Sequence, residues 1–263
     1  MPDDARPVLV TGGTGTLGRA LVRTLLDDGR AVRVLSRREP TPAAPQAVDF
    51  VTGDLLTGEG VREAVAGVSA VVHCASDPRH PDRDLDAAAQ LLLAARAAQV
   101  PHLVYISIVG VDRVPLGYYK IKHEVEDLVE NAGVPWTILR ATQFHDLVAT
   151  MLGQLAKAPV VVVPDGLLDQ PVDVREVARR LADLARQEPQ GRVPDLGGPQ
   201  VLTVAELART YLTATGRRRP VWSVPLVLRA TPFRDNGHLA REHAVGRTTF
   251  AEWVQQRTGS PAA

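Results

Sequence analysis

The fold is decided by the stretch Val8-Leu9-Val10-Thr11-Gly12-Gly13-Thr14-Gly15-Thr16-Leu17-Gly18. Its first three residues form a short apolar run, which predicts a buried strand. A glycine cluster ends the run, and a helical pattern of apolar residues follows it: Leu17, Leu21, Val22, Leu25 and Leu26. In the spacing Gly13-x-Gly15-x-x-Gly18, the first glycine permits a tight turn, the second lets the backbone approach a pyrophosphate, and the third lets helix and strand pack closely. The stretch therefore predicts a dinucleotide-binding turn, with the phosphates at the helix N-terminus.

The bulk composition is that of an ordinary globular protein. A chain of 263 residues with 45% hydrophobic residues is able to bury a sizeable core. Its 30 basic and 30 acidic residues cancel, so we expect neither a nucleic-acid partner nor an anionic membrane partner. Cys74 is the one cysteine, which leaves no intramolecular disulfide and suits a reducing compartment. From the acidic start Met1-Pro2-Asp3-Asp4 we expect no signal peptide, and no apolar stretch reaches the ~18–20 residues of a membrane helix. We expect a cytoplasmic monomer or homodimer that acts on a small-molecule substrate.

The first half of the chain alternates strands with helices. Apolar runs predict strands at 31–35, 48–51, 70–75, 103–107 and 136–140, and helical patterns fall at 58–67, at about 85–99 and from 116 to 131. The proline-rich segment 40–45 is expected to be an extended loop, and 77–84 a polar loop. Such alternation predicts an α/β fold with a Rossmann-like, doubly wound parallel sheet.

Beyond Arg140 the pattern changes. We expect helices at 145–156, 175–187 and 204–214, strands at 160–163 and 221–224, and a last helix between 238 and 256. Thr203 and Glu206 have the spacing of a capping box for the helix that starts at 204. We therefore divide the chain into a Rossmann domain that binds the cofactor, 1–142, and a smaller mixed α/β substrate lobe, 143–263, interleaved with it.

The end of the second strand indicates which dinucleotide binds. An NAD enzyme usually has Asp or Glu here for the ribose 2′-hydroxyl, whereas arginine accommodates a 2′-phosphate. This chain has Ser36-Arg37-Arg38, so NADP(H) is preferred and NAD(H) stays possible. The plainer alternative is two solvated arginines. Asp54 falls at a strand end in reach of an adenine, or serves only its turn. The residues expected to contact the cofactor are Gly12, Thr14, Gly15, Thr16, Leu17, Gly18, Ser36, Arg37, Arg38, Asp54, Leu55, Cys74, Ala75, Ser76 and Lys122.

Three side chains near the expected nicotinamide position suit carbonyl reduction. Tyr118 and Lys122 are four residues apart and project from nearly the same helical face, while Ser107 ends the preceding strand. A phenol is a poor acid–base group at neutral pH, and a nearby ammonium lowers its pKa toward the working pH. The lysine is also able to hold the ribose hydroxyls, and Ser107 to hydrogen-bond the substrate oxygen. Tyr119 and His123 form a competing pair one residue on.

At these residues the chain resembles the short-chain dehydrogenase/reductase superfamily, in its atypical or extended NmrA-like branch. The resemblance runs from Val8 to about Val177. It rests on the cofactor turn, on Gly53-Asp54-Leu55, on His73-Cys74-Ala75-Ser76, on Tyr118-x-x-x-Lys122 with Ser107, on Gly133-Val134-Pro135-Trp136-Thr137-Ile138-Leu139-Arg140, and on Val172-Asp173-Val174. It implies an NAD(P)H-dependent oxidoreductase that transfers hydride between NADP(H) and a small carbonyl, quinone or related acceptor.

The chain departs from this pattern at two points. Ser107 and Tyr118 are only 11 residues apart, and Ala141 replaces the proline that commonly follows the arginine. NmrA-like proteins include non-catalytic NADP(H) sensors that act through a protein partner, so this regulatory role is the alternative; Tyr118 is then idle. Gln143 and Phe144 are candidates to line the substrate pocket. The seven histidines lack metal-ligand spacing, so no metal is expected.

Overall fold

A computed structural model describes residues 6–39, 46–225, 233 and 235–259. The chain divides into two compact units, each described here by itself. The first unit comprises Met1–Ser107, Leu116–Arg140 and Val177–Pro194, and the second comprises Ile108–Pro115, Ala141–Glu176 and Asp195–Ala263. The expected proline-rich loop at 40–45 lies outside the described residues.

The first unit is built on a seven-stranded sheet in the order β3-β2-β1-β4-β5-β6-β9. β1 pairs in parallel with both β2 and β4, so the strand order reverses at β1 as in a doubly wound fold. The predicted Rossmann-like α/β fold is confirmed. The short seventh strand, which pairs with β6, was not predicted. The strands are β1 (Val8–Thr11), β2 (Val32–Ser36), β3 (Val48–Thr52), β4 (Ala70–His73), β5 (Leu103–Ile108), β6 (Trp136–Ala141) and β9 (Gly191–Arg192).

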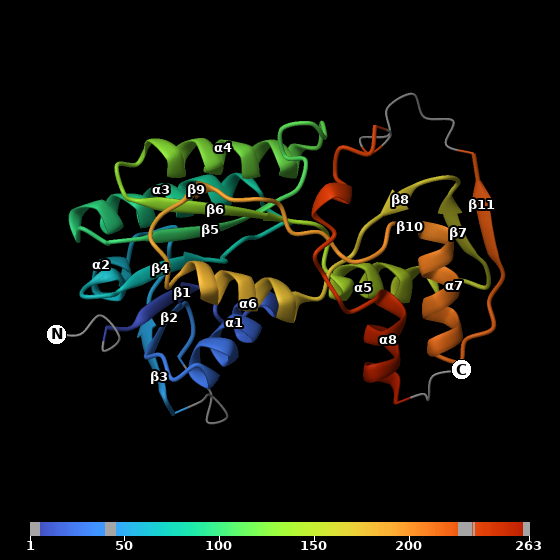
Figure 1. Cartoon of the computed structure of the whole chain (residues 1–263), viewed down its shortest axis with the longest axis horizontal. Coiled ribbons are helices and arrows are strands. Elements are labelled where there is room, and N and C mark those ends of the chain that lie inside the picture. Colours follow the sequence, from blue (N-terminus) through green and yellow to red (C-terminus); the bar gives the residue numbers. More distant parts are fainter. Residues whose placement is uncertain (1–5, 40–45, 226–232, 234, 260–263) are drawn as a thin grey trace. The chain divides into compact units, whose positions relative to one another are not determined.

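Helices cover both faces of this sheet. In Figure 1, α3 and α4 lie on one side of it and α1 and α6 on the other. The helices are α1 (Thr16–Asp27), α2 (Val61–Val65), α3 (Asp82–Ala97), α4 (Gly117–Asn131) and α6 (Val174–Leu184). Apolar side chains from the strands, such as Leu9, Val71 and Leu103, pack with Leu91 of α3 and Val125 of α4 in one buried cluster. Removing this surface from water is the main stabilisation of the first unit.

Two predicted boundaries in this unit were wrong. The helix expected over 58–67 is only α2, because Gly58, Gly60 and Gly67 have left-handed φ angles of 78°, 68° and 67° that a continuous helix cannot contain. The polar loop expected over 77–84 ends earlier, since α3 begins at Asp82. That shift moves Asp84 from a loop into the first turn of a helix.

The second unit has a separate core. Val148 and Leu152 of α5, Val161 of β7, Leu207 of α7 and Trp253 of α8 belong to one buried cluster. The predicted capping box of Thr203 and Glu206 is confirmed, and Thr249 with Glu252 forms a second one at α8. Its elements are α5 (His145–Leu155), β7 (Val161–Pro164), β8 (Leu168–Asp169), β10 (Leu202–Thr203), α7 (Val204–Ala214), β11 (Val221–Val224), a short 3₁₀ turn (Arg241–His243) and α8 (Phe250–Thr258).

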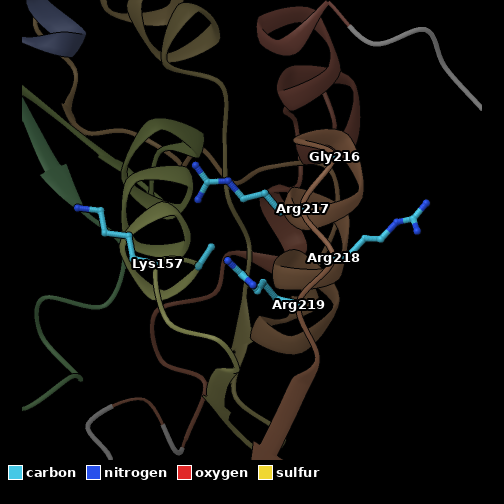
Figure 2. A pocket seen from close by; sticks show the side chains of 6 residues that line it. Lys157, Gly216, Arg217, Arg218 and Arg219 are labelled. Atoms are coloured by element: carbon cyan, nitrogen blue, oxygen red, sulfur yellow. The ribbon is translucent and has the colours of Figure 1, made fainter.

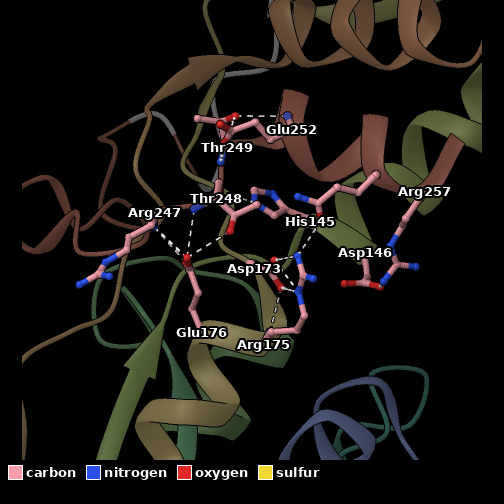
Figure 3. Close-up of polar contacts among 11 residues, drawn as sticks. His145, Asp146, Asp173, Arg175, Glu176, Arg247, Thr248, Thr249, Glu252 and Arg257 are labelled. Atoms are coloured by element: carbon pink, nitrogen blue, oxygen red, sulfur yellow. Dashed lines mark hydrogen bonds and ion pairs between the residues drawn. The ribbon is translucent and has the colours of Figure 1, made fainter. Parts of the chain in front are cut away.

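Within the second unit, a polar network joins the start of α8 to residues 173–176, which contain the first residues of α6 and belong to this unit (Figure 3). The Glu176 carboxylate accepts hydrogen bonds from the backbone N–H groups of Arg247 and Thr248, at 2.9 and 3.0 Å, and from the Thr248 hydroxyl at 3.2 Å. The Arg175 guanidinium donates to Asp173 at 2.6 and 2.9 Å. Burial would raise the pKa of Asp173, but the hydrogen bonds from the Arg175 side chain and backbone outweigh it and lower that pKa. The network therefore fixes residues 247–249, from which α8 starts.

None of the helices in the described part of the chain combines the length and the apolar character that crossing a membrane requires.

Candidate functional site

The glycine turn follows the carboxyl end of β1, where the strand order of the sheet reverses. Gly12 has φ +67°, and a Cβ there would stand 2.7 Å from the Ala75 backbone. A Cβ at Gly18 would stand 2.1 Å from the Gly12 carbonyl oxygen, and one at Gly13 2.8 Å from the Val34 side chain. These three glycines are needed for the backbone angle and for close packing of α1 on the sheet.

Gly15 has a different surrounding, which fits a phosphate. It is the N-cap of α1, no side chain caps this helix, and its first turn holds no acidic residue. A Cβ at Gly15 would meet only the Gly12 carbonyl oxygen, at 3.2 Å, so the remaining side is open. The first N–H groups of a helix favour an anion at this place. The turn thus fits the pyrophosphate of a dinucleotide. Thr14 and Thr16 are exposed beside it, whereas the Leu17 side chain is buried and offers only its backbone.

At the end of β2, a serine turn presents two arginines. The Arg38 backbone N–H donates to the Ser36 hydroxyl at 3.2 Å, and that hydroxyl donates to the Arg38 carbonyl oxygen at 2.9 Å. Arg37 and Arg38 are exposed. Ser36 therefore serves the turn, and the guanidiniums remain available to a 2′-phosphate.

The end of β3 makes a second turn, in which Asp54 has a local role. Its carboxylate accepts a hydrogen bond from the Leu56 backbone N–H at 2.9 Å. Leu55 packs against the core of the first unit. The structure thus shows the turn role of Asp54; its contact with an adenine stays a prediction.

The end of β4 is held against β1 by buried polar groups that the sequence did not reveal. The Thr11 hydroxyl lies 2.7 Å from His73 Nδ1 and accepts the Ala75 backbone N–H at 3.4 Å. The His73 ring stacks on the Tyr105 ring, with centroids 5.5 Å apart. Burial, and then the charge of Lys122, lower the pKa of His73 to about 3. Cys74 is a free thiol whose pKa burial raises to about 12, so it is not a nucleophile at neutral pH.

Lys122 is buried beside β5, with 4% of its surface exposed. Its ammonium donates to the Ile106 carbonyl oxygen at 3.1 Å and lies 4.4 Å from the centroid of the Tyr105 ring. Burial lowers the pKa of Lys122 to about 8, although the carboxylate of Asp84 opposes this change. Glu126, one turn further along α4, forms a bidentate ion pair with the buried Arg140 at 2.8 and 2.5 Å. This pair ties α4 to β6 and so fixes the helix that carries Lys122.

Tyr118 does not have the electrostatic environment that we expected. Its phenol oxygen lies 2.7 Å from the Ser76 hydroxyl. Burial raises the pKa of Tyr118 most, the hydrogen bond with Ser76 acts in the opposite direction, and the negative charges of Asp84 and Asp77 raise the pKa further, so that it lies above its usual value. The expected lowering of this pKa by Lys122 was wrong, because the ammonium of Lys122 contacts Ile106 and Tyr105 instead. The competing Tyr119 is buried.

Ser107 lies near the end of β5 with a buried hydroxyl. In the described part of the chain, this hydroxyl has no hydrogen-bond partner. A buried hydroxyl without a partner costs free energy, which a ligand oxygen would recover. The site in the first unit thus offers an unpaired hydroxyl, a buried ammonium and a phenol.

Gln143 and Phe144, the candidate substrate residues, lie in the second unit where β6 leads into α5. Both are half-buried, and the Gln143 carbonyl oxygen accepts the Val172 backbone N–H at 2.8 Å. The chain thus runs from the sixth strand into the second unit through this segment, but their contact with a substrate stays a prediction.

The second unit also contains a basic hollow of about 650 Å³ (Figure 2). Four cationic side chains and no carboxylate line this hollow. The lining residues are Ala156, Lys157, Gly216, Arg217, Arg218 and Arg219. Lys157 follows the end of α5, and the Arg217 backbone N–H donates to the Leu212 carbonyl oxygen at the end of α7. Cations are favoured at helix C-termini, which explains this charge without a ligand. None of the residues predicted for cofactor or substrate lies there.

Comparison with known proteins also indicates a nucleotide-binding fold. A profile of the NAD(P)H-binding family matches residues 12–188. The chain is 33% identical over 217 residues to a (4-alkanoyl-5-oxo-2,5-dihydrofuran-3-yl)methyl phosphate reductase of Streptomyces griseus, covering 80% of this chain and 74% of the relative. It is 28% identical over 234 residues to the Photosystem II assembly factor Ycf39 of Trieres chinensis, covering 84% and 73%. The NADPH complex of the Escherichia coli NADPH-dependent quinone oxidoreductase QOR2 shares its fold, with a TM-score of 0.76, 20% identity and coverage of 95% and 99%.

Proposed function

Because the chain belongs to the NAD(P)H-binding family, we propose that it is an NADP(H)-dependent reductase of a small carbonyl or quinone acceptor. The observation that carries this proposal is Lys122. A buried ammonium is costly unless it is well paired. In the described part of the chain its one hydrogen bond goes to the Ile106 carbonyl oxygen, so two of its three N–H donors remain for a ligand. A ribose with vicinal hydroxyls is a suitable acceptor for them.

In this proposal each residue of the site has one role. Gly15, Thr16 and the first turn of α1 bind the pyrophosphate, and Arg37 with Arg38 binds the 2′-phosphate. The bound nicotinamide supplies the hydride. Ser107 donates its free hydroxyl to the acceptor oxygen, which stabilises negative charge there. Tyr118 donates the proton that completes the reduction.

The reaction is tested by NADPH oxidation over a panel of quinones and aldehydes. Lys122→Met should lower kcat/KM by about 100-fold or more, because positioning of the cofactor ribose depends on the ammonium. Lys120→Met is the matched control on the same helix: Lys120 is exposed and, among the described residues, forms an ion pair with Glu124 at 3.8 Å, so its loss should leave kcat/KM unchanged. Equal effects of the two substitutions would contradict the proposal.

The cofactor preference is tested by Arg37→Ala. A guanidinium bound to a phosphate contributes about 1.5–3 kcal/mol, so the Kd of NADPH should rise by roughly 10- to 100-fold. The Kd of NADH, which lacks the 2′-phosphate, should change little and is the internal control. Titration of each dinucleotide by protein fluorescence gives both constants. An equal loss for both dinucleotides would reject the 2′-phosphate assignment.

A second candidate is a non-catalytic NADP(H) sensor that acts through a protein partner. One observation favours it: a relative of the chain is named an assembly factor. Tight NADPH binding without turnover of any acceptor in the panel would select this candidate over the reductase.

A further inference from the structure

A chain of hydrogen bonds in the first unit connects α4 to α3 through the loop after β4. The Tyr118 phenol oxygen lies 2.7 Å from Ser76 Oγ, and Ser76 Oγ lies 2.5 Å from Asp84 Oδ2. The other oxygen of Asp84 accepts the Asp77 backbone N–H at 2.7 Å. Asp84 stands in the first turn of α3 and is 7% exposed, so bulk water does not solvate its carboxylate. Two hydrogen bonds therefore link this carboxylate to the phenol oxygen.

The direction of these hydrogen bonds follows from counting protons. A carboxylate only accepts, so the bond between Ser76 and Asp84 uses the single proton of the Ser76 hydroxyl. Ser76 Oγ can then only accept from Tyr118. The phenol is the donor in its own bond, which requires that it keep its proton. A Ser76 hydroxyl that donated to the phenolate would lower the pKa of Tyr118. Because the Asp84 carboxylate already accepts the Ser76 proton, the bond to Tyr118 instead uses the phenol proton and favours the neutral phenol.

The charges around the phenol act in the same direction. Asp84 on α3 and Asp77 in the preceding loop both raise the pKa of Tyr118, after the larger effect of burial. On the sheet side lies the buried Tyr105, whose pKa is raised by burial and then by the charge of Tyr118. Lys122 shares the helix of Tyr118, but its ammonium lies against the Tyr105 ring and the Ile106 carbonyl oxygen. The phenolate therefore faces two carboxylates, while the cation contacts other groups.

We propose that Asp84, acting through the Ser76 hydroxyl, is a positioning residue that holds Tyr118 as a protonated phenol. This inference rests on the proposed reductase function for its catalytic meaning. In reduction the acceptor carbon gains a hydride from the cofactor, the acceptor oxygen gains the Tyr118 proton, and the O–H bond of Tyr118 breaks. In the reverse reaction, an alcohol must give its proton to a phenolate, which this arrangement disfavours. The site is therefore built for reduction, and solvent restores the phenol proton afterwards.

The protonation state is measured without substrate or cofactor, by titrating tyrosine absorbance near 295 nm. The difference between wild type and Tyr118→Phe isolates the titration of Tyr118. Asp84→Asn removes the charge and should lower the Tyr118 midpoint by about 1 pH unit or more. Asp86→Asn is the matched control, since Asp86 is an exposed carboxylate on the same helix; it should leave the midpoint unchanged. A midpoint in Asp84→Asn that equals or exceeds that of wild type overturns the proposal.

Ser76→Ala tests the direction of the hydrogen bonds and keeps the buried Asp84 intact. If the phenol donates to Ser76, removing the acceptor lowers the Tyr118 midpoint, by less than Asp84→Asn does because the charge remains. If Ser76 instead donates to Tyr118, its removal raises the midpoint, and the proposal fails.

The catalytic consequence is read separately, from the pH profile of kcat/KM for reduction. The high-pH limb, where Tyr118 loses its proton, should move to lower pH in Asp84→Asn and stay in place in Asp86→Asn. A shifted absorbance midpoint without turnover of any acceptor would support the role of Asp84 and reject the reductase. Turnover with an unshifted midpoint and an unshifted limb would support the reductase and reject the role of Asp84.

Discussion

The two units hold their carboxylates in different ways. In the second unit, Glu176 accepts from two backbone N–H groups and a hydroxyl, and Asp173 is bound by the Arg175 guanidinium and backbone. In the first unit, Asp84 reaches a titratable phenol through the rotatable hydroxyl of Ser76. A carboxylate whose lone pairs are filled by backbone donors fixes the path of the chain. A carboxylate linked to a phenol also sets where a proton resides, and substitutions should separate these two kinds of role.

The largest loss of stability is expected from Arg140→Met. This change leaves the buried Glu126 carboxylate of the first unit without its bidentate partner, with only His123 Nδ1 nearby at 3.8 Å among the described residues, which costs about 3–5 kcal/mol of unfolding free energy. Urea denaturation, followed by far-ultraviolet circular dichroism, measures it. Arg186→Met is the control, because Arg186 pairs with Asp183 at the surface and such pairs contribute about 0–1 kcal/mol. Similar losses in the two variants would show that the buried pair does not anchor α4.

A smaller effect is expected from pH, through His73. The unfolded imidazole takes up a proton below about pH 6.5, whereas folded His73 resists protonation until its pKa of about 3. The unfolded state then binds more protons, so the free energy of unfolding falls by ~1.4 kcal/mol for each pH unit below 6.5 and is insensitive to this group above it.

This dependence is isolated by comparing wild type with His73→Gln from pH 7 to pH 4. The variant should lose less stability on acidification, since glutamine does not titrate. His145 and His238, whose pKa values burial also lowers, remain in both proteins and cancel in the difference. Parallel pH curves would mean that His73 is not held neutral in the folded state.

The smallest of the three stability effects is expected from Glu176→Gln. The substitution replaces charge-assisted hydrogen bonds to Arg247 and Thr248 by weaker ones, at a cost of about 1.5–3 kcal/mol. Trp253 on α8 reports the loss by fluorescence during denaturation. Glu242→Gln, an exposed change in the same unit, is the control. If the comparison between the units holds, Glu176→Gln leaves the Tyr118 titration unchanged; a shifted midpoint would break it.

Much of the fold was predictable because its signals are local. The glycine turn, the parallel strands and the capping box of Thr203 were all read from residues within one turn or one strand of each other. Other features were missed. β9 has only two residues, which is too short for a recognisable sequence pattern. The positive φ angles of Gly58, Gly60 and Gly67 limit α2 to Val61–Val65. The capping box at Thr249 has the same Thr-x-x-Glu spacing as the one at Thr203, so its signal is present in the sequence.

The candidate site also combines features that local sequence determines with features that depend on tertiary contacts. The sequence by itself determined the turn from Gly12 to Gly18, because a Cβ at Gly12 or Gly18 would collide with backbone atoms and only glycine tolerates that geometry. It also placed Tyr118 and Lys122 one helical turn apart. Only the tertiary structure decided what surrounds the phenol. Ser76 lies 42 residues from Tyr118 along the chain, and packing of α3 beside α4 brings the Asp84 charge to it. A pKa depends on burial and on charges in space, which the spacing of residues along a chain does not record.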